Sequence, residues 1–449
     1  MPLPLDESTG WILIFGASVR AASEAAAKAG YRVIAVDQFG DQDTRRWAKF
    51  WAPLDPADPA GSLLSAIDCC RQKLPTCPPA LNLVALSCGG LESWFEHLEP
   101  LRNALKLLIP STHVLRQLRD PHLLQQMTKA TCVRFPPTRF TRPTAHQPNT
   151  TQSRAGWLTK HIRSSAGLGV RFDEEASSLP GQAAIVDPAA DAPADRYWQQ
   201  HVSGRAVGVN LLCGGPGGVK ILSTCRAINY SQPASPFLYG GSLGPYPLQP
   251  HERAAILEFA AQLIRKVNFV GLLGSDWLLS RDGTSPWLLE LNPRYTASME
   301  VWERLFASSL VDAQLASYQL EDQQLKKMAF EPPANKSGNS DNLANSAHLP
   351  SGSPASIIKF VLWAPRELIF SLNQLTAWAQ QCELEPDKIQ WCDLPAEGTV
   401  IPAASPIVTA ILHHTDSSNA GKPLWRALRK LRRLQESLRT NPQTEDGAG

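Results

Sequence analysis

The chain of 449 residues lacks the features that mark several protein classes. Its 43 basic and 41 acidic residues leave a net charge of only +2, so no overall field favours nucleic acid or an acidic membrane surface. No apolar run approaches the roughly 18 residues that a membrane span needs, and the first ten residues lack the basic and apolar blocks of a secretory signal. The nine cysteines form no Cys-x-x-Cys pair, which argues against a disulfide framework and against a zinc site. We therefore expect a cytoplasmic protein that binds neither nucleic acid nor membrane.

What is present is typical of a folded protein with several domains. Charged residues make up only 19%, but the 43% of hydrophobic residues suffices for several cores. At roughly 150 residues per domain, the length corresponds to about three domains.

The first part of the chain alternates strand and helix patterns. The expected elements are a buried strand over 11–15, an alanine-rich helix over 23–29 that Gly30 ends, and further strands over 31–36 and 81–86. Strands that alternate with helices predict a parallel sheet with helices on both faces. We expect a Rossmann-like domain over residues 1–118.

The pattern changes near residue 119. A helix is expected over 122–129, a polar loop over 142–153, Gly-rich turns between short apolar runs up to residue 300, and an amphipathic helix over 252–266. This texture predicts an α+β domain over residues 119–330.

The last part begins with residues 331–355, a Pro-, Asn-, Ser- and Gly-rich segment that we expect to be a flexible linker. Strands over 357–363 and 407–412 predict a small β-rich domain over residues 356–415. Residues 416–449 predict a helix with leucines on one face and basic residues on the other, followed by a disordered tail over 441–449. We interpret the basic face as solvated; binding to nucleic acid or acidic lipid is the alternative.

The run Leu288-Leu289-Glu290-Leu291-Asn292-Pro293-Arg294 is the strongest candidate for chemistry. Glu290 and Asn292 stand two residues apart on one strand, so both side chains point to the same face. Carboxylate and amide oxygens suit Mg²⁺, and Arg294 offers a fixed fork for a phosphate or carboxylate. The alternative is an ordinary strand end with surface polar groups.

A second apolar run, 274–279, carries Asp276, and a predicted turn over 281–284 separates it from the first. Antiparallel pairing of the two runs would bring Asp276 next to Glu290. Two carboxylates that meet in a cleft raise each other's pKa unless a cation joins them. The sequence therefore predicts a divalent cation at Asp276, Glu290 and Asn292.

A candidate anion site lies upstream. Lys160 ends a short strand over 156–160, and the loop 164–170 that follows contains Gly167 and Gly169. Small residues let backbone N–H groups approach an anion closely. The alternatives are a solvated lysine at a strand edge and a simple turn.

These segments, in this order and together with Tyr197-Trp198-Gln199-Gln200-His201-Val202-Ser203-Gly204, resemble the ATP-grasp superfamily over roughly residues 119–310. Within it the chain is most similar to a group described as predicted ATP-dependent carboligases. Residues 16–20 and 37–41 resemble the Rossmann-like domain that precedes such folds, and residues 393–400 and 406–408 resemble the small C-terminal domain of that group.

The resemblance implies an ATP-grasp fold of two α+β subdomains that close on ATP, and it assigns roles to particular residues. Lys160 would contact an ATP phosphate, with Gly167 and Gly169 in the loop that covers the phosphates. Gln199, Gln200, His201 and Val202 would line the adenine and ribose. Asp276, Glu290 and Asn292 would bind Mg²⁺ or Mn²⁺, and Arg294 would stabilise the transferring phosphoryl group.

The implied reaction is that of an ATP- and Mg²⁺-dependent carboxylate–amine ligase. Such enzymes activate a carboxylate as an acyl phosphate, and an amine or similar nucleophile then attacks it. Relatives of this group suggest a place in one-carbon cofactor metabolism, of the tetrahydromethanopterin or methanofuran type. The expected partners are small-molecule carboxylate and amine substrates and a second copy of the chain in a homodimer.

Two departures keep other functions open. The stretch 120–125 lacks the early lysine that many members carry, and residues 199–201 lack a glutamate that is common there. These changes favour an alternative in which the protein binds ATP as a regulator or scaffold with weakened turnover.

A dinucleotide site over 16–20, with Asp37 as the ribose partner, would instead make the protein an NAD-dependent oxidoreductase, but the second and third glycines of that fingerprint are missing. The Gly-rich segment 239–245 is a candidate substrate contact or a simple turn. Cys88 is a candidate nucleophile for which no partner histidine is identifiable.

Overall fold

The computed structural model describes residues 10–142, 156–173, 195–214, 218–232, 235–280, 283–306, 308–318, 356–414 and 421–440. The predicted linker 331–355, the tail 441–449 and nearly all of the loop 142–153 lie outside these ranges. Among the described helices, none combines the length and the apolar character that crossing a bilayer would require.

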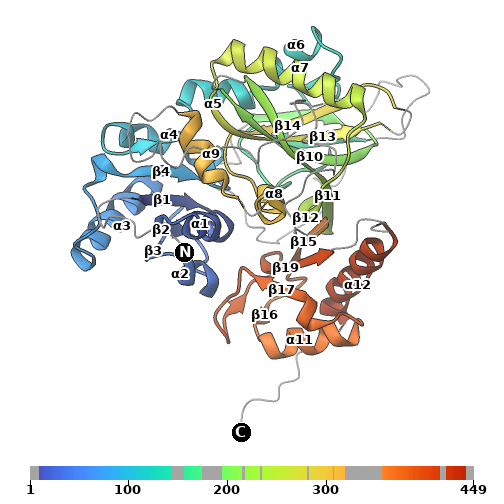
Figure 1. Cartoon of the computed structure of the whole chain (residues 1–449). Coiled ribbons are helices and arrows are strands. Elements are labelled where there is room, and N and C mark those ends of the chain that lie inside the picture. The colour runs from blue at the N-terminus through green and yellow to red at the C-terminus, as the bar shows by residue number, and fades with distance from the viewer. Residues whose placement is uncertain are drawn as a thin grey trace, which may run out of the picture.

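The N-terminal part is a five-stranded parallel sheet in the order β3-β2-β1-β4-β5, drawn in blue in Figure 1. Its strands are β1 (Trp11–Gly16), β2 (Arg32–Asp37), β3 (Phe50–Pro53), β4 (Val84–Ser87) and β5 (Lys106–Leu107). Its helices are α1 (Arg20–Lys28), α2 (Gln42–Trp47), α3 (Pro59–Lys73), α4 (Leu91–Leu98) and α5 (Thr112–Arg119). The predicted Rossmann-like arrangement is confirmed.

One predicted strand boundary in this part is wrong. The expected strand over 81–86 begins only at Val84, because Ala80–Asn82 forms a 3-10 turn and the Leu81 side chain is 63% exposed. β3 is absent from the sequence prediction, since its four residues include a proline and carry no strand periodicity.

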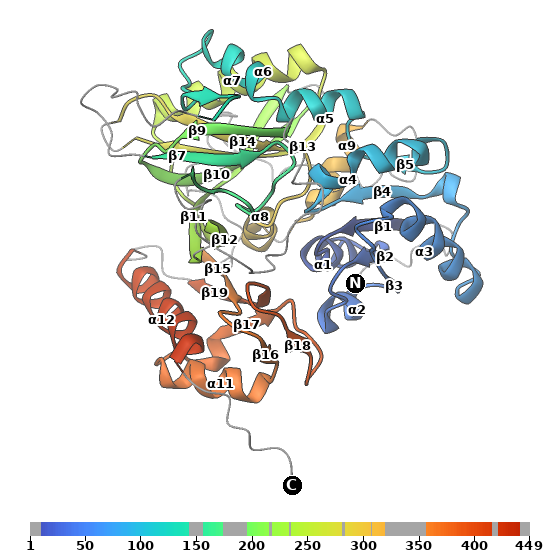
Figure 2. The ribbon, with the colours of Figure 1, turned by 180° about the vertical axis from the view of Figure 1, so that it is seen from behind.

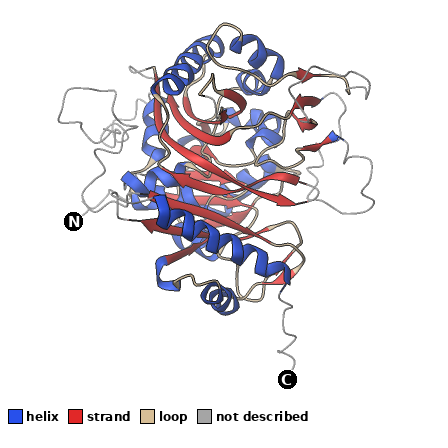
Figure 3. Cartoon of the chain, turned by 90° about the vertical axis from the view of Figure 1, so that its right-hand side faces the viewer, coloured by secondary structure: helices blue, strands red, loops and turns tan. Residues whose placement is uncertain are grey.

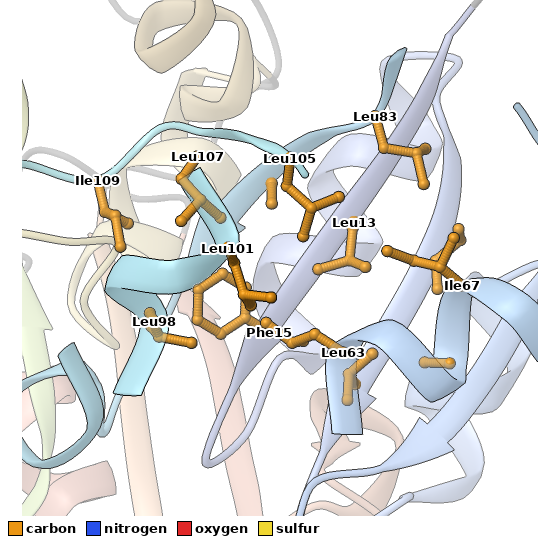
Figure 4. Close-up of a cluster of buried hydrophobic side chains, with 14 of the residues drawn as sticks. Leu13, Phe15, Leu63, Ile67, Leu83, Leu98, Leu101, Leu105, Leu107 and Ile109 are labelled. Carbon is orange, nitrogen blue, oxygen red and sulfur yellow. The ribbon is translucent and has the colours of Figure 1, made fainter. Parts of the chain in front are cut away.

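Both faces of this sheet are covered by apolar side chains. Leu13 and Phe15 pack beneath α3 and α4, in the cluster that Figure 4 shows with Leu63, Leu98 and Leu101. On the other face, Ile12 and Ile14 pack with residues 295–315 from the next part of the chain. Because a side chain at every second position points to the same face, β1 contributes to both clusters.

The middle part contains a four-stranded sheet and most of a larger one. The small sheet has the order β6-β9-β7-β8. Its strands are β6 (Thr138–Arg139), β7 (Trp157–His161), β8 (Arg171–Phe172) and β9 (Arg196–Gln200). The helix α6 (Pro121–Thr128) precedes it, as predicted.

The large sheet has eight antiparallel strands in the order β14-β13-β10-β11-β12-β15-β19-β17. Its strands from the middle part are β10 (Arg205–Cys213), β11 (Val219–Gln232), β12 (Ser235–Gly244), β13 (Gly271–Leu279) and β14 (Trp287–Asn292). The helix α7 (Pro250–Val267) packs on this sheet through Phe259 and Leu263, and α8 (Met299–Phe306) and α9 (Leu310–Ser317) join it to the N-terminal part.

The C-terminal part has no large sheet of its own. Its strands β15 (Ser356–Trp363), β17 (Ile389–Cys392) and β19 (Pro406–His414) continue the large sheet, because β15 pairs with β12. Only β16 (Leu368–Ile369) and β18 (Val400–Ile401) pair separately. Figure 2 shows this part, in orange and red, below the middle part, with α11 (Leu372–Gln381) and α12 (Gly421–Thr440) beside its strands.

The leucine-rich face predicted for the C-terminal helix is confirmed. Leu428, Leu431 and Leu434 of α12 are buried against the C-terminal strands. The secondary-structure view in Figure 3 shows that the sheets lie in the interior, with helices around them. The fold is thus mixed α/β, with a parallel N-terminal sheet and antiparallel sheets beyond it.

Candidate active site

The carboxylates of Asp276 and Glu290 come from neighbouring strands. β13 and β14 pair antiparallel with Asp276 opposite Glu290, as the sequence predicts. Side chains directly opposite in such a pair lie about 5 Å apart at Cβ. Asn292, two residues along β14, is 5% exposed and faces the same point.

The amide of Asn292 lies between the two carboxylates. Its Nδ2 donates to Asp276 Oδ2 at 3.0 Å and to Glu290 Oε1 at 3.2 Å. Its Oδ1 accepts from Arg119 and Arg294, both at 3.4 Å. If the Asn292 amide rotated by half a turn, its oxygen would face the two carboxylates. A cation could then take the position that the Asn292 N–H groups hold between them.

The electrostatics of the pair favour a bound cation. Burial, together with the Glu290 charge, raises the pKa of Asp276 to about 8. Burial also acts to raise the pKa of Glu290, but Arg119 and Lys160 outweigh it and hold that pKa below its ordinary value. At neutral pH the pair therefore holds a proton that a divalent cation would displace.

No group of three or more His, Cys, Asp or Glu side chains able to hold a metal occurs in the described part of the chain, so the donor set would be two carboxylates and an amide.

Lys160 reaches this pair from the small sheet. It lies on β7, is 7% exposed, and its Nζ donates to Gln199 Oε1 at 3.1 Å and to the Leu289 carbonyl at 3.4 Å. The lysine is therefore a buried link between the two sheets, and the alternative of a solvated strand-edge lysine is wrong.

The glycine loop that follows β7 is packed against β12. Gly167 has φ +77° and Gly169 has φ +71°, a region that favours glycine. The Tyr239 N–H donates to the Ala166 carbonyl at 2.9 Å, and a Cβ on Gly167 would lie 1.9 Å from the Phe237 carbonyl oxygen. The loop thus spans from the lysine strand to the large sheet.

The four residues 199–202 line the same cavity in different ways. Gln199 is buried, accepts from Lys160 and donates to Thr138 Oγ1 at 3.2 Å. The His201 ring contacts Phe172 and Phe237 at centroid distances of 5.5 and 5.9 Å, and burial lowers its pKa. Gln200 and Val202 line the cavity beside them.

Arg294 does not point freely into the cavity. Its guanidinium is buried, and its Nε donates to Glu92 Oε1 of α4 at 2.7 Å. A cavity of about 2360 Å³ is nevertheless lined by Arg294 together with every other predicted site residue: Lys160, Gly167, Gly169, Gln199, Gln200, His201, Val202, Asp276, Glu290 and Asn292.

Arg119, at the end of α5, is a site residue that the sequence analysis missed. Its guanidinium donates to the carbonyls of Leu291 (2.9 Å), Ile162 (2.9 Å) and Ser164 (2.5 Å), and lies 3.8 Å from Glu290 Oε2. It adds a positive charge immediately before the stretch 120–125, which lacks a lysine. No local pattern marks this arginine, because its partners lie far along the chain.

Two other sequence candidates lose their support. The Cys88 thiol is buried, and burial raises its pKa far above the ordinary value, which disfavours the thiolate that a nucleophile needs. The Asp37 carboxylate, the candidate ribose partner of a dinucleotide, accepts from Val19 N, Gly40 N and Trp51 Nε1 instead.

Comparisons with known proteins point to one fold. Residues 122–298 match the sequence profile described as an ATP-grasp domain. A comparison with curated proteins found no match.

Several solved structures share the fold over nearly their whole length at low sequence identity. The L-amino acid ligase from Bacillus licheniformis is 12% identical, with a TM-score of 0.58 over 95% of this chain and 97% of that one. The N5-carboxyaminoimidazole synthetase from Staphylococcus aureus, complexed with ADP, is 12% identical, with a TM-score of 0.59 over 93% and 96%. Biotin carboxylase from Campylobacter jejuni is 13% identical, with a TM-score of 0.58 over 96% and 95%.

Proposed function

Because the chain carries an ATP-grasp domain over residues 122–298, we propose that the protein is an ATP- and Mg²⁺-dependent ligase that joins a carboxylate to an amine or similar nucleophile. The observation that carries the proposal is the meeting of Asp276 and Glu290 across two strands, with Lys160 beside them from the opposite sheet. A pair of half-buried carboxylates with a lysine suits a bound metal–triphosphate, whose charges it would balance.

The proposed reaction has two steps. A substrate carboxylate oxygen attacks the γ-phosphorus of ATP, the bond to ADP breaks, and an acyl phosphate forms. The amine nitrogen then attacks the acyl carbon, phosphate leaves, and the nitrogen loses a proton. Both steps need positioning and charge neutralisation more than covalent help from protein.

Each residue of the site has a place in this scheme. Mg²⁺, when bound by Asp276, Glu290 and Asn292, neutralises phosphate charge. Lys160 binds a phosphate, and the loop with Gly167 and Gly169 excludes water, because acyl phosphates hydrolyse easily. Glu92 fixes the Arg294 guanidinium through its Nε, and the remaining N–H groups of Arg294 donate to the transferring phosphoryl group or the acyl phosphate.

A second candidate function is an ATP-binding regulator with weakened turnover. Its support is that Lys160 and Arg294, which would stabilise the transferring group, already bind Gln199 and Glu92. A carboxylate–amine ligase should release ADP only when both substrates are present, whereas a regulator should bind ATP with Mg²⁺ and release none.

The test is a screen of carboxylate and amine pools for ATP-dependent products by mass spectrometry, with ADP release measured in parallel. The ligase proposal predicts an amide product whose formation needs ATP and Mg²⁺. ATP binding without any product from any pool would instead support the regulator. The association with one-carbon cofactor metabolism stays a prediction.

A further inference from the structure

The loop after β2 holds the carboxylate of Asp41 at the wall of the cavity, and contacts of Asp37 at the end of β2 fix this loop. Asp37 accepts from Val19 N at 3.2 Å, Gly40 N at 2.9 Å and Trp51 Nε1 at 2.8 Å. Gly40 has φ +63°, and a Cβ there would lie 2.5 Å from the Trp51 ring. These contacts fix the loop and thereby set the position of Asp41, which lines the cavity.

Asp41 itself lacks a side-chain partner among the residues that the structure describes. Its side chain is 7% exposed, and no hydrogen bond or ion pair to its carboxylate is found within the described ranges. The guanidinium of Arg20, whose charge acts on Asp41, is taken by other carboxylates: Glu24 (3.0 Å), Asp43 (3.6 Å), Asp393 (3.0 Å) and Glu300. A largely buried carboxylate at a cavity wall without a protein partner must be satisfied by water, by a proton or by a ligand.

The surroundings of Asp41 are acidic. Burial is the main cause that raises its pKa to about 8, and the charges of Asp393, Asp37 and Asp43 add to the effect, with only Arg20 opposing it. The guanidinium of Arg45, on α2, lies over the Trp51 ring and donates to the Gly40 carbonyl at 2.7 Å.

The arrangement suits an ammonium group better than a metal ion. Within the described ranges no three carboxylates, histidines or cysteines converge as metal ligands. An ammonium needs only a few acceptors for its N–H groups and gains from nearby negative charge. Asp393, which also lines the cavity and has a side chain 23% exposed, accepts from Arg20 Nε at 3.0 Å and from Arg20 Nη2 at 3.4 Å; a carboxylate has about four lone-pair sites and can accept a further N–H.

We propose that Asp41 and Asp393 bind the ammonium group of a primary amine, which becomes the nucleophile of the reaction once a proton passes from its nitrogen to the Asp41 carboxylate. This inference rests on the proposed function, since it assigns the amine site of that reaction. The same cavity is lined by Arg294 and Glu290, so an amine held at Asp41 shares one space with the acyl phosphate. The Tyr295 N–H donates to the Ser87 carbonyl at 3.2 Å, which joins the segment after β14 to β4, a strand of the sheet in which β2 leads to Asp41.

The test compares a charged probe with a neutral one of similar shape. Ligand-observed NMR at pH 8.5 would measure the binding of n-butylammonium and of butan-1-ol to the full chain. We expect wild type to bind butylammonium at least tenfold more tightly than butanol. Equal affinities in wild type would overturn the proposal without any need for a variant.

A substitution locates the site. Asp41→Asn should remove the preference for butylammonium, whereas Asp68→Asn, an exposed aspartate on α3, should keep it. A preference that persists in a folded Asp41→Asn protein would place the amine elsewhere.

A separate assay tests the proposed function itself. Hydroxylamine is uncharged at this pH and traps acyl phosphates as hydroxamates, so hydroxamate formation by wild type from a carboxylate pool, ATP and Mg²⁺ reports the activation step alone. Absence of any hydroxamate contradicts the ligase, whereas loss of ammonium preference alone contradicts the amine site.

Discussion

At the scale of single residues, the site depends on charges that offset one another. Asp276 and Glu290 would repel, but Arg119 and Lys160 stabilise the ionised form of Glu290, and Asp276 takes the proton. The spacing of Glu290 and Asn292 and their antiparallel partner Asp276 could be predicted from sequence, because strand periodicity fixes which side chains share a face. Arg119 could not, since its Leu291 partner lies 172 residues away.

Glu303 gives a pH prediction at this scale. Its carboxylate is buried on α8, where Tyr295 Oη and Leu310 N donate to it, and burial raises its pKa to about 8 from 4.5. A carboxyl with a raised pKa binds its proton more tightly in the folded state. Its stabilising contribution is therefore complete below pH 4.5 and is lost as the pH rises through 8.

Between these pH values the Glu303 carboxyl should lower the free energy of unfolding by up to about 1.4 kcal/mol per pH unit. Glu303→Gln should remove that component, as measured by urea unfolding at pH 5, 6, 7 and 8. The exposed Glu258→Gln on α7 is the control, and identical slopes in both variants would refute the assignment.

At the scale of elements, the glycine loop and β12 form one unit. The Tyr239 N–H bond to Ala166 and the close approach of Gly167 to Phe237 hold the loop on the strand. The sequence could predict a small-residue loop after Lys160, but not the strand on which it rests, because β12 is far along the chain.

Alanine substitutions at Gly167 and Gly169 distinguish the effect of the contact with β12 from the effect of backbone strain. Both have positive φ, so alanine at either should cost about 1–2 kcal/mol of local strain. Only Gly167→Ala adds a clash with the Phe237 carbonyl, since nothing lies within 4 Å of a Cβ on Gly169. We expect Gly167→Ala to weaken Mg-ATP binding at least tenfold more than Gly169→Ala in calorimetric titrations. Equal affinities would show that the loop does not need its contact with β12.

The predicted elements agree with the structure where periodicity is strong. The strand over 11–15, the helix over 252–266 and the leucine face of α12 all occur as expected. The strand is an apolar run buried on both faces, and each helix buries one apolar face. β3 has only four residues, and β15 links the C-terminal strands to the rest of the large sheet by its pairing with β12. Neither feature leaves a local signal in the sequence.

At the scale of the whole molecule, Arg20 ties the three parts together. It is fully buried and pairs with Glu24 of its own helix, with Glu300 of α8 and with Asp393 of the C-terminal part. Lys359 of β15 also binds Glu300, at 2.7 Å. The cavity walls from different parts of the chain are thus fixed by buried ion pairs.

Removal of Arg20 should therefore weaken the whole fold. Arg20→Met leaves buried carboxylates without their cation, which typically costs about 3–5 kcal/mol. Lys28→Met removes a lysine that is 57% exposed and pairs with the same Glu24, so it should cost less than about 1 kcal/mol. Denaturant unfolding measures both, and similar costs would mean that the Arg20 network contributes no more than a surface pair.

The most direct test of the proposed ATP site is calorimetric titration of Mg-ATP into wild type, Glu290→Gln and the exposed control Glu258→Gln. We predict that wild type and Glu258→Gln bind Mg-ATP alike, that omission of Mg²⁺ weakens binding, and that Glu290→Gln lowers affinity at least tenfold while its unfolding transition is unchanged. Equal affinity of a folded Glu290→Gln protein, with or without Mg²⁺, would contradict the account.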